Sequence, residues 1–113
     1  MNFTQDQLNG IVQEAKTAAY TAADTFFKNT MQGQDRGACG FAWTNIYGIK
    51  GNTKLGKMLK AAGVTQDYTR AFQIWNPSQH GCQNIDTKEA GAVAAANVFR
   101  KYGFDAHAGS RLD

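Results

Sequence analysis

The chain has 113 residues, which is the size of a single domain and long enough to bury a core without disulfides or a metal. Its 42% hydrophobic and 19% charged residues exclude an intrinsically disordered chain, and no run approaches the roughly 20 apolar residues of a membrane span. Residues 41–113 carry nine Lys or Arg and five Asp or Glu, which gives +4, and residues 1–40 carry −1, so the net charge is +3, far below the basicity of a dedicated duplex-binding domain.

A long N-terminal helix is predicted first. Thr4-Gln5-Asp6-Gln7 has the pattern of a capping box, with a hydroxyl at the cap and Gln three residues later. Apolar residues then recur at helical spacing as far as Met31, so residues 1–32 form the helical region. A helix of about 26 residues would be about 39 Å long, longer than so small a domain is expected to cover. We therefore expect part of its surface, including Tyr20 and Phe27, to contact another copy in a homo-oligomer or another molecule. A break of the helix near Asn29 or Gly33 is the alternative.

The next unit is a strand, a loop and a helix. Residues 41–47 alternate with period two, so that the odd-numbered residues from Phe41 to Tyr47 face one way and the even-numbered residues face the other. Glycines within residues 48–51 then turn the chain. Asn52 or Thr53 caps a helix that runs to about residue 62, and Gly63 ends it.

A second unit of the same kind follows. Residues 66–69 are predicted as a loop, residues 70–75 as a strand, and Asp86 with Glu89 as the capping box of a helix that runs to about Tyr102. Small residues are frequent in this helix, which lets a neighbouring helix or sheet approach closely. Residues 104–112 are predicted as a final strand.

These elements predict an α+β fold in one domain over residues 1–113. The long helix is followed by two β-loop-α units and a last strand, which form a sheet of three or four strands with the helices on one face. The two units share an aromatic strand, a Thr-Lys pair at the helix start and a terminal glycine. Residues 41–113 are therefore interpreted either as a duplicated βα unit plus the C-terminal strand or as two ordinary βα units.

The glycine turn after the first strand is the main candidate binding site. Its backbone amides and the following helix N-terminus can bind an anion, and lysines lie on both sides of it. The glycine spacing is not that of a Walker loop, and a solvated turn that merely caps a helix is the alternative. The predicted ligand-binding residues are Tyr47, Lys50, Gly51, Asn52, Thr53, Lys54, Lys57 and Trp75.

Aromatic residues on the strands have two interpretations. Aromatics beside lysines can stack on nucleic-acid bases, but more often they form the core beneath helices. Tyr47 and Trp75, near strand ends, are expected to be exposed and to supply the stacking face. The residues expected to be buried are Phe41, Trp43, Phe72 and Ile74.

The remaining candidates for chemistry are Cys39, His80, Cys82 and His107. They lack the paired spacing of a zinc site, and no acid or amide is visibly placed to orient a Cys–His pair, so no metal, cofactor or catalytic residue is assigned. Two reduced thiols, a disulfide and a cysteine nucleophile stay open as alternatives. Arg111 is expected either beside the basic turn or in a surface ion pair.

Several motifs together resemble small uncharacterised proteins of tailed bacteriophages, including cyanophage-like viruses. The matching segments are Gly37–Trp43 (GACGFAW), Lys50–Thr53 (KGNT), Trp75–Pro77 (WNP), Gln83–Ala92 and Ser110–Asp113 (SRLD). The resemblance implies a setting, the cytoplasm of an infected bacterium or a virion, and no mechanism.

We therefore expect a small non-enzymatic protein that binds a nucleotide, a nucleic-acid phosphate or an acidic host protein through the basic turn. The first alternative is a structural or oligomerising protein, such as a virion component or a host-enzyme inhibitor, that uses the N-terminal helix. The second is an enzyme with Cys39 or Cys82 as nucleophile. The first residues lack the pattern of a signal peptide, so no membrane association is expected.

Overall fold

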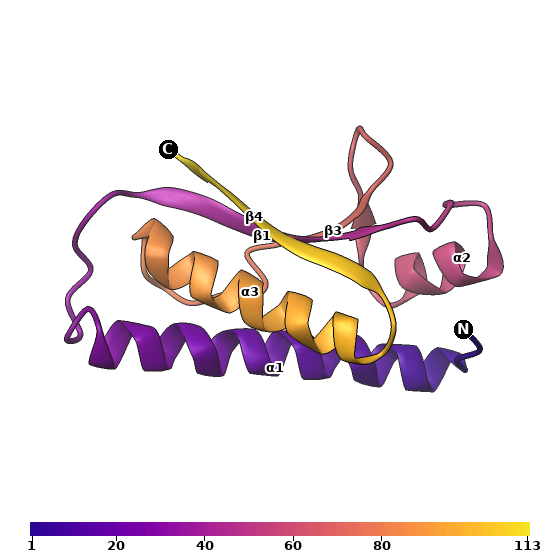
Figure 1. Ribbon diagram of the computed structural model, residues 1–113, viewed down its shortest axis with the longest axis horizontal. Coiled ribbons are helices and arrows are strands. Elements are labelled where there is room, and N and C mark those ends of the chain that lie inside the picture. Colours follow the sequence, from indigo (N-terminus) through magenta and orange to yellow (C-terminus); the bar gives the residue numbers. More distant parts are fainter.

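The computed structural model describes all residues, Met1–Asp113, as three helices and one four-stranded antiparallel sheet with strand order β2-β3-β1-β4. Figure 1 shows α1 and α3 stacked beneath the sheet, with α2 at one end of that layer. The predicted α+β class with helices on one face is confirmed. No helix is both long and apolar enough to cross a membrane. In chain order the elements are α1 (Gln5–Asn29), β1 (Gly40–Tyr47), α2 (Lys54–Ala61), β2 (Thr65–Gln66), β3 (Phe72–Trp75), α3 (Ile85–Lys101) and β4 (Asp105–Leu112).

Side-chain caps fix where the helices begin. The Gln7 N–H donates to Thr4 Oγ1 and the Thr4 N–H donates to Gln7 Oε1, which is the predicted capping box of α1. Thr53 caps α2 by accepting from Gly56 N–H. The predicted cap of α3 at Asp86 is wrong, because the buried Asn84 accepts the Thr87 N–H at 2.9 Å and starts the helix earlier.

Small residues let α1 and α3 pack closely against each other. A Cβ added to Gly91 would lie 3.0 Å from the Ala19 carbonyl oxygen, so the two backbones are nearly in contact there. At 1.5 Å per residue α1 is roughly 37 Å long, and its buried positions end at Ala23, before its last turn. The buried residues of α1 are Leu8, Ile11, Val12, Ala15, Ala19 and Ala23.

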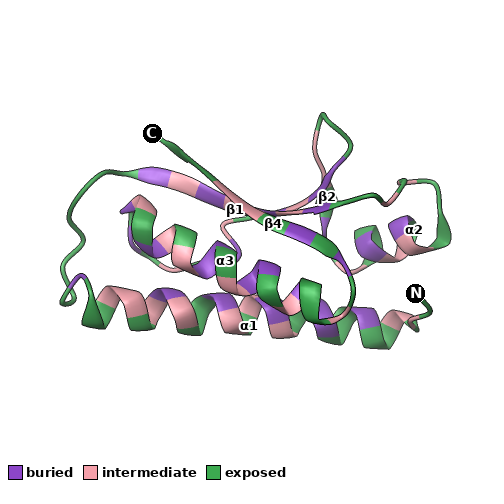
Figure 2. Cartoon of the chain, viewed as in Figure 1, coloured by how far each residue is buried: buried purple, intermediate pink, exposed green.

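The two faces of the sheet differ in composition. The even-numbered residues of β1 face the helices, where the Thr44 hydroxyl donates to the Ala92 carbonyl of α3 at 2.9 Å. The period-two alternation is confirmed, and β1 is banded by burial in Figure 2. Phe72 and Ile74 are buried as predicted. The predicted burial of Phe41 and Trp43 is wrong: both are half-buried on the face that carries no helix. Around Thr44, where its hydroxyl reaches the Ala92 carbonyl of α3, the space between α3 and β1 fits only small side chains.

Two details of the sheet also differ from the prediction. Gln66, expected at the start of a loop over residues 66–69, instead pairs with β3 together with Thr65 as the short strand β2. Arg111 pairs with Phe41, whereas Asp105 pairs with Tyr47. Because β4 runs antiparallel to β1, Arg111 lies at the opposite end of β1 from the basic turn, and its expected place beside that turn is wrong.

Candidate functional site

A cluster of three aromatic rings lies on the uncovered face of the sheet; Phe41, Trp43 and Trp75 are called the aromatic cluster below. Trp43 and Trp75 are directly opposite on β1 and β3, and their rings stack with centroids 5.4 Å apart and planes 8° apart. Phe41 lies 5.6 Å from Trp75, centroid to centroid. Trp75 remains 48% exposed, as predicted for this residue. Apolar rings left on a surface in this way commonly mark a contact with a ligand or partner.

A glycine makes room for the ring of Trp43. A Cβ added to Gly109 of β4 would lie 2.4 Å from Trp43 Nε1 and 2.6 Å from Cε2, so the indole lies directly on the backbone of β4. With any larger residue at position 109 the ring would have to lift off the sheet. Gly109 therefore keeps the aromatic cluster flat, although nothing in the one-dimensional pattern marked it.

Two cations lie over the aromatic cluster. The Arg111 guanidinium carbon is 5.5 Å from the Phe41 centroid and 6.0 Å from that of Trp75. Lys88 Nζ, from the first turns of α3, is 5.5 Å from the Phe41 centroid and also donates to the Gly40 carbonyl at 2.9 Å. These distances fit cation–π contacts. The sequence pattern could not place either cation here, because only the β1–β4 register and the fold of α3 bring them to Phe41.

Polar groups continue the same face toward the other end of β1. Gln73 Nε2 donates to Asn45 Oδ1 at 3.0 Å, and Asn45 Nδ2 donates to the Tyr47 hydroxyl at 3.0 Å. Tyr47 is 42% exposed, as predicted, and its ring lies 5.9 Å from that of His107. The face therefore runs from aromatic to polar over the length of β1.

A basic hollow opens beyond Tyr47. Its volume is about 800 Å³, and its charged lining residues, Lys50, Lys60 and Arg70, are all cations. No Asp or Glu lines it, so its lining carries three positive charges and no negative one, which favours an anionic ligand. The hollow contains the predicted turn residues Lys50, Gly51 and Asn52; its complete lining is Gly48, Ile49, Lys50, Gly51, Asn52, Lys60, Gln66 and Arg70.

The turn beside the hollow is held by α2. The Thr53 hydroxyl donates to the Lys50 carbonyl at 2.6 Å while it caps the helix, and Lys60 Nζ reaches back to the Gly51 carbonyl at 3.3 Å. Gly56 permits this packing, because a Cβ there would lie 2.2 Å from the Lys50 carbonyl oxygen.

The predicted lysines do not all meet at the hollow. Lys54 instead lines a separate groove beside Met1–Phe3, and Lys57 is exposed on α2 without lining the hollow. Lys60 and Arg70 take their places there. Lys60 belonged to the basic stretch that the sequence marked, but Arg70 was missed because it comes from the β2–β3 loop.

That loop is shaped by an aspartate. Asp67 Oδ1 accepts the Thr69 N–H at 2.8 Å and the Ala71 N–H at 3.1 Å, which holds Arg70 in the left-handed region with φ 70°. Gln66 Nε2 also donates to the Arg70 carbonyl at 2.9 Å. In Figure 1 the loop rises from the sheet on the side away from the helices.

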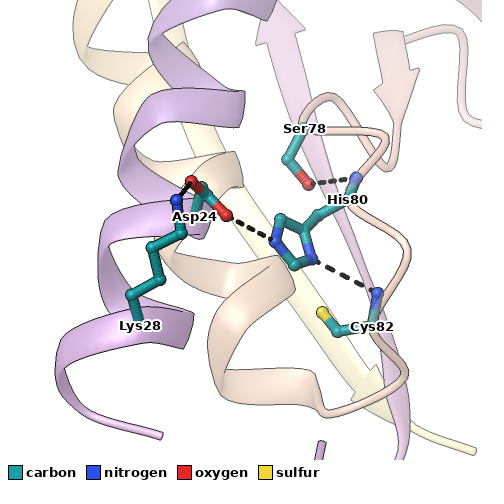
Figure 3. Close-up of polar contacts among 5 residues, drawn as sticks. All are labelled: Asp24, Lys28, Ser78, His80 and Cys82. Atoms are coloured by element: carbon teal, nitrogen blue, oxygen red, sulfur yellow. Dashed lines mark hydrogen bonds and ion pairs between the residues drawn. The ribbon is translucent and has the colours of Figure 1, made fainter. Parts of the chain in front are cut away.

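His80 forms a separate cluster on the helix side of the molecule (Figure 3). Its Nδ1 accepts the Cys82 N–H at 3.3 Å, so its Nε2 carries the proton toward Asp24 Oδ1, 3.2 Å away. Lys28 pairs with the same carboxylate at 2.8 Å, and the hydrogen bonds from Lys28 and then His80 lower the pKa of Asp24. Ser78 Oγ accepts the His80 backbone N–H. Both ring nitrogens are thus engaged, and the arrangement ties the 76–82 loop to α1.

The cysteines occupy contrasting environments and are both free. Cys39 is exposed, with its thiol 3.9 Å from Gln83 Oε1. Cys82 is buried, and desolvation, followed by the nearby Asp35 carboxylate, raises the pKa of its thiol. A raised pKa is the opposite of what activates a cysteine nucleophile. The side chains of the chain also place no three His, Cys, Asp or Glu together in a group that could hold a metal ion.

Comparisons with known proteins give no match to a family model, a curated protein or a solved structure.

Proposed function

We propose that the protein binds single-stranded nucleic acid across the uncovered face of its sheet. Bases would stack on the aromatic cluster, with Trp75 as the most accessible ring, and phosphates would contact Arg111 at one end and the basic hollow at the other. The observation that carries the proposal is the exposed, cation-flanked aromatic cluster on a helix-free sheet face. Aromatic side chains in a positively charged groove are the usual means by which proteins hold unpaired bases.

The geometry favours single strands over a duplex. Duplex bases are stacked on each other inside the helix, so their faces cannot reach Trp75 or Trp43. The strand β1, from Gly40 to Tyr47, spans roughly 23 Å over its seven intervals at about 3.3 Å per residue, which is long enough to contact a few nucleotides. The net charge of +3 is consistent with a modest number of phosphate contacts rather than wrapping of a duplex.

Tryptophan fluorescence provides a direct test, because both tryptophans of the chain belong to the aromatic cluster. Titration with an oligodeoxythymidine should change the emission, and a duplex of the same length should change it much less. Unchanged emission with the single strand, or equal affinity for the duplex, would overturn the proposal. Polyglutamate tests the acidic-protein alternative: binding to it with the same affinity would favour a host protein as partner.

Two pairs of variants locate the interface, with a labelled oligonucleotide as the probe. Trp75→Ala should weaken binding by about 1–3 kcal/mol, or roughly 5- to 150-fold, whereas Tyr20→Ala on α1 should leave it unchanged. Lys60→Glu should weaken binding and flatten the dependence of log K on log salt by about 0.7 per lost phosphate contact. Lys57→Glu makes the same charge change three residues earlier on α2 and should have a much smaller effect.

The proposed setting is a phage-infected bacterium, on the strength of the motif resemblance. A protein that covers transiently unpaired phage or host strands would act there without an enzymatic step. The predicted homo-oligomer through α1 stays a prediction. The ring centroids of Phe27 and His80 are 5.1 Å apart, so Tyr20, at 51% exposure, is the more open of the two residues expected at that contact.

A further inference from the structure

The outer edge of the sheet at β4 is unpaired. β4 is eight residues long and is the last strand in the order, with β1 on one side and no strand on the other (yellow in Figure 1). The Asp113 N–H donates to the Cys39 carbonyl, so the odd-numbered residues of this end of the chain bond toward β1. The even-numbered residues Ala106, Ala108 and Ser110 therefore direct their N–H and C=O groups outward.

This edge lacks several of the usual devices that prevent pairing, although it carries the charged residues Asp105 and Arg111. It has no proline or lysine, its centre is the small pair Ala108-Gly109, and all eight residues are extended. One outward carbonyl, that of Ala106, accepts from Arg100 Nε at 2.7 Å, and the carbonyl oxygen has a second lone pair. A long open edge of this kind can pair with another strand.

The charges on β4 suit an antiparallel second copy. If a two-fold axis passes through Ala108, Asp105 lies opposite Arg111 of the other copy, and Ala106 lies opposite Ser110. Opposite charges at directly opposed positions stabilise an antiparallel pair. An axis at Gly109 would instead oppose Asp105 and Asp113, which carry like charges.

The helix layer repeats the same complementarity. Glu89 of α3 lies at the level of Ser110, whose hydroxyl donates to it at 2.6 Å, and Arg100 of α3 lies at the level of Ala106. Because Ser110 would face Ala106 across the axis, Glu89 would face Arg100 of the second copy. Val93, 44% exposed, lies between them on α3 and would face the second copy near the axis.

We propose that the chain forms a two-fold dimer by antiparallel pairing of β4 with β4 of a second copy. The dimer has one eight-stranded sheet, with the helices of both copies on one side and the two aromatic clusters on the other. This isologous contact closes on itself, which explains how an open edge avoids unlimited growth. It uses β4 and α3, and not the α1 surface predicted from the sequence.

Analytical ultracentrifugation of the purified chain over a micromolar concentration series tests the proposal without nucleic acid, so its result is independent of the binding function. A reversible dimer is expected, together with amide exchange at Ala108 and Ser110 that slows as protein concentration rises. A monomer at every concentration overturns the proposal. So does a dimer in which these two amides are not protected, because that dimer uses another surface.

Charge-swapped variants test the register. In the Glu89→Arg variant, the new arginine lies opposite Arg100 of the other copy, and the two-fold axis repeats this repulsion. The variant should therefore weaken association about tenfold or more. Glu89→Arg combined with Arg100→Glu restores opposite charges and should recover dimerisation. Asp6→Arg, an equal charge change on α1, is the matched control. Ala108→Pro removes an outward N–H without removing a bond to β1 and should give a folded monomer. This register is overturned if the double variant dimerises no more tightly than Glu89→Arg alone. It is also overturned if Asp6→Arg weakens the dimer as much as Glu89→Arg does.

Discussion

Glycine-to-alanine substitution should have opposite effects at two helical positions. In the interior of a helix the change normally stabilises by up to about 1 kcal/mol, because alanine has the higher helix propensity. At Gly56 in α2, however, the new methyl group would lie 2.2 Å from the Lys50 carbonyl oxygen and 3.0 Å from the Gly51 Cα. Ordinary contacts begin near 3.4 Å, so the turn or the helix must move. We expect Gly56→Ala to destabilise the fold by about 1–3 kcal/mol, the usual cost of overpacking.

Gly10→Ala is the matched control. Gly10 lies in the interior of α1, and a Cβ there meets nothing within 4 Å. This variant should be more stable than the wild type by about 0.5–1 kcal/mol. Urea denaturation followed by far-UV circular dichroism measures both free energies of unfolding, and a parallel thermal melt should shift by about 4 °C per kcal/mol. A Gly56→Ala protein as stable as Gly10→Ala would refute the close contact between α2 and the turn.

Three further outcomes are expected. Asp35 accepts the Gln83 and Asn84 backbone N–H groups at 2.8 and 3.0 Å, and the Gln83 bond in particular lowers the pKa of its carboxyl below the ordinary 3.8. Its contribution to stability is therefore present above pH 3.8 and lost as the pH falls through the lowered value. Asp35→Asn should cost about 1–2 kcal/mol at neutral pH and converge with the wild type in acid denaturation. A thiol reagent should label exposed Cys39 in the native protein and buried Cys82 only after unfolding; mass spectrometry that finds Cys82 modified first would contradict this. Thr44→Val keeps the shape but removes the bond to α3, and urea denaturation should record a loss of about 1 kcal/mol.

Much of the local structure follows from short-range chemistry that a sequence records directly. The Thr4 capping box, the Thr53 cap and the alternation of Phe41–Tyr47 are each set by residues within a few positions of one another. These patterns predicted the element order apart from the short strand β2, the α+β class and the exposure of Tyr47 and Trp75. The cap of α3 failed for a tertiary reason, because Asn84 is held by Asp35 from a distant segment.

The sequence by itself determined that β1 has two chemically different faces, and only the tertiary structure decided which face the helices cover. Large rings are the usual choice for a core, but α3 approaches β1 closely enough for Thr44 to reach the Ala92 carbonyl, and only small side chains fit there. The aromatic cluster is left on the open face. The antiparallel register then brings Arg111 to Phe41, and the folding of α2 brings Lys60 back to Gly51. Spacing along the chain cannot encode these contacts, because they depend on which segments pack together in space.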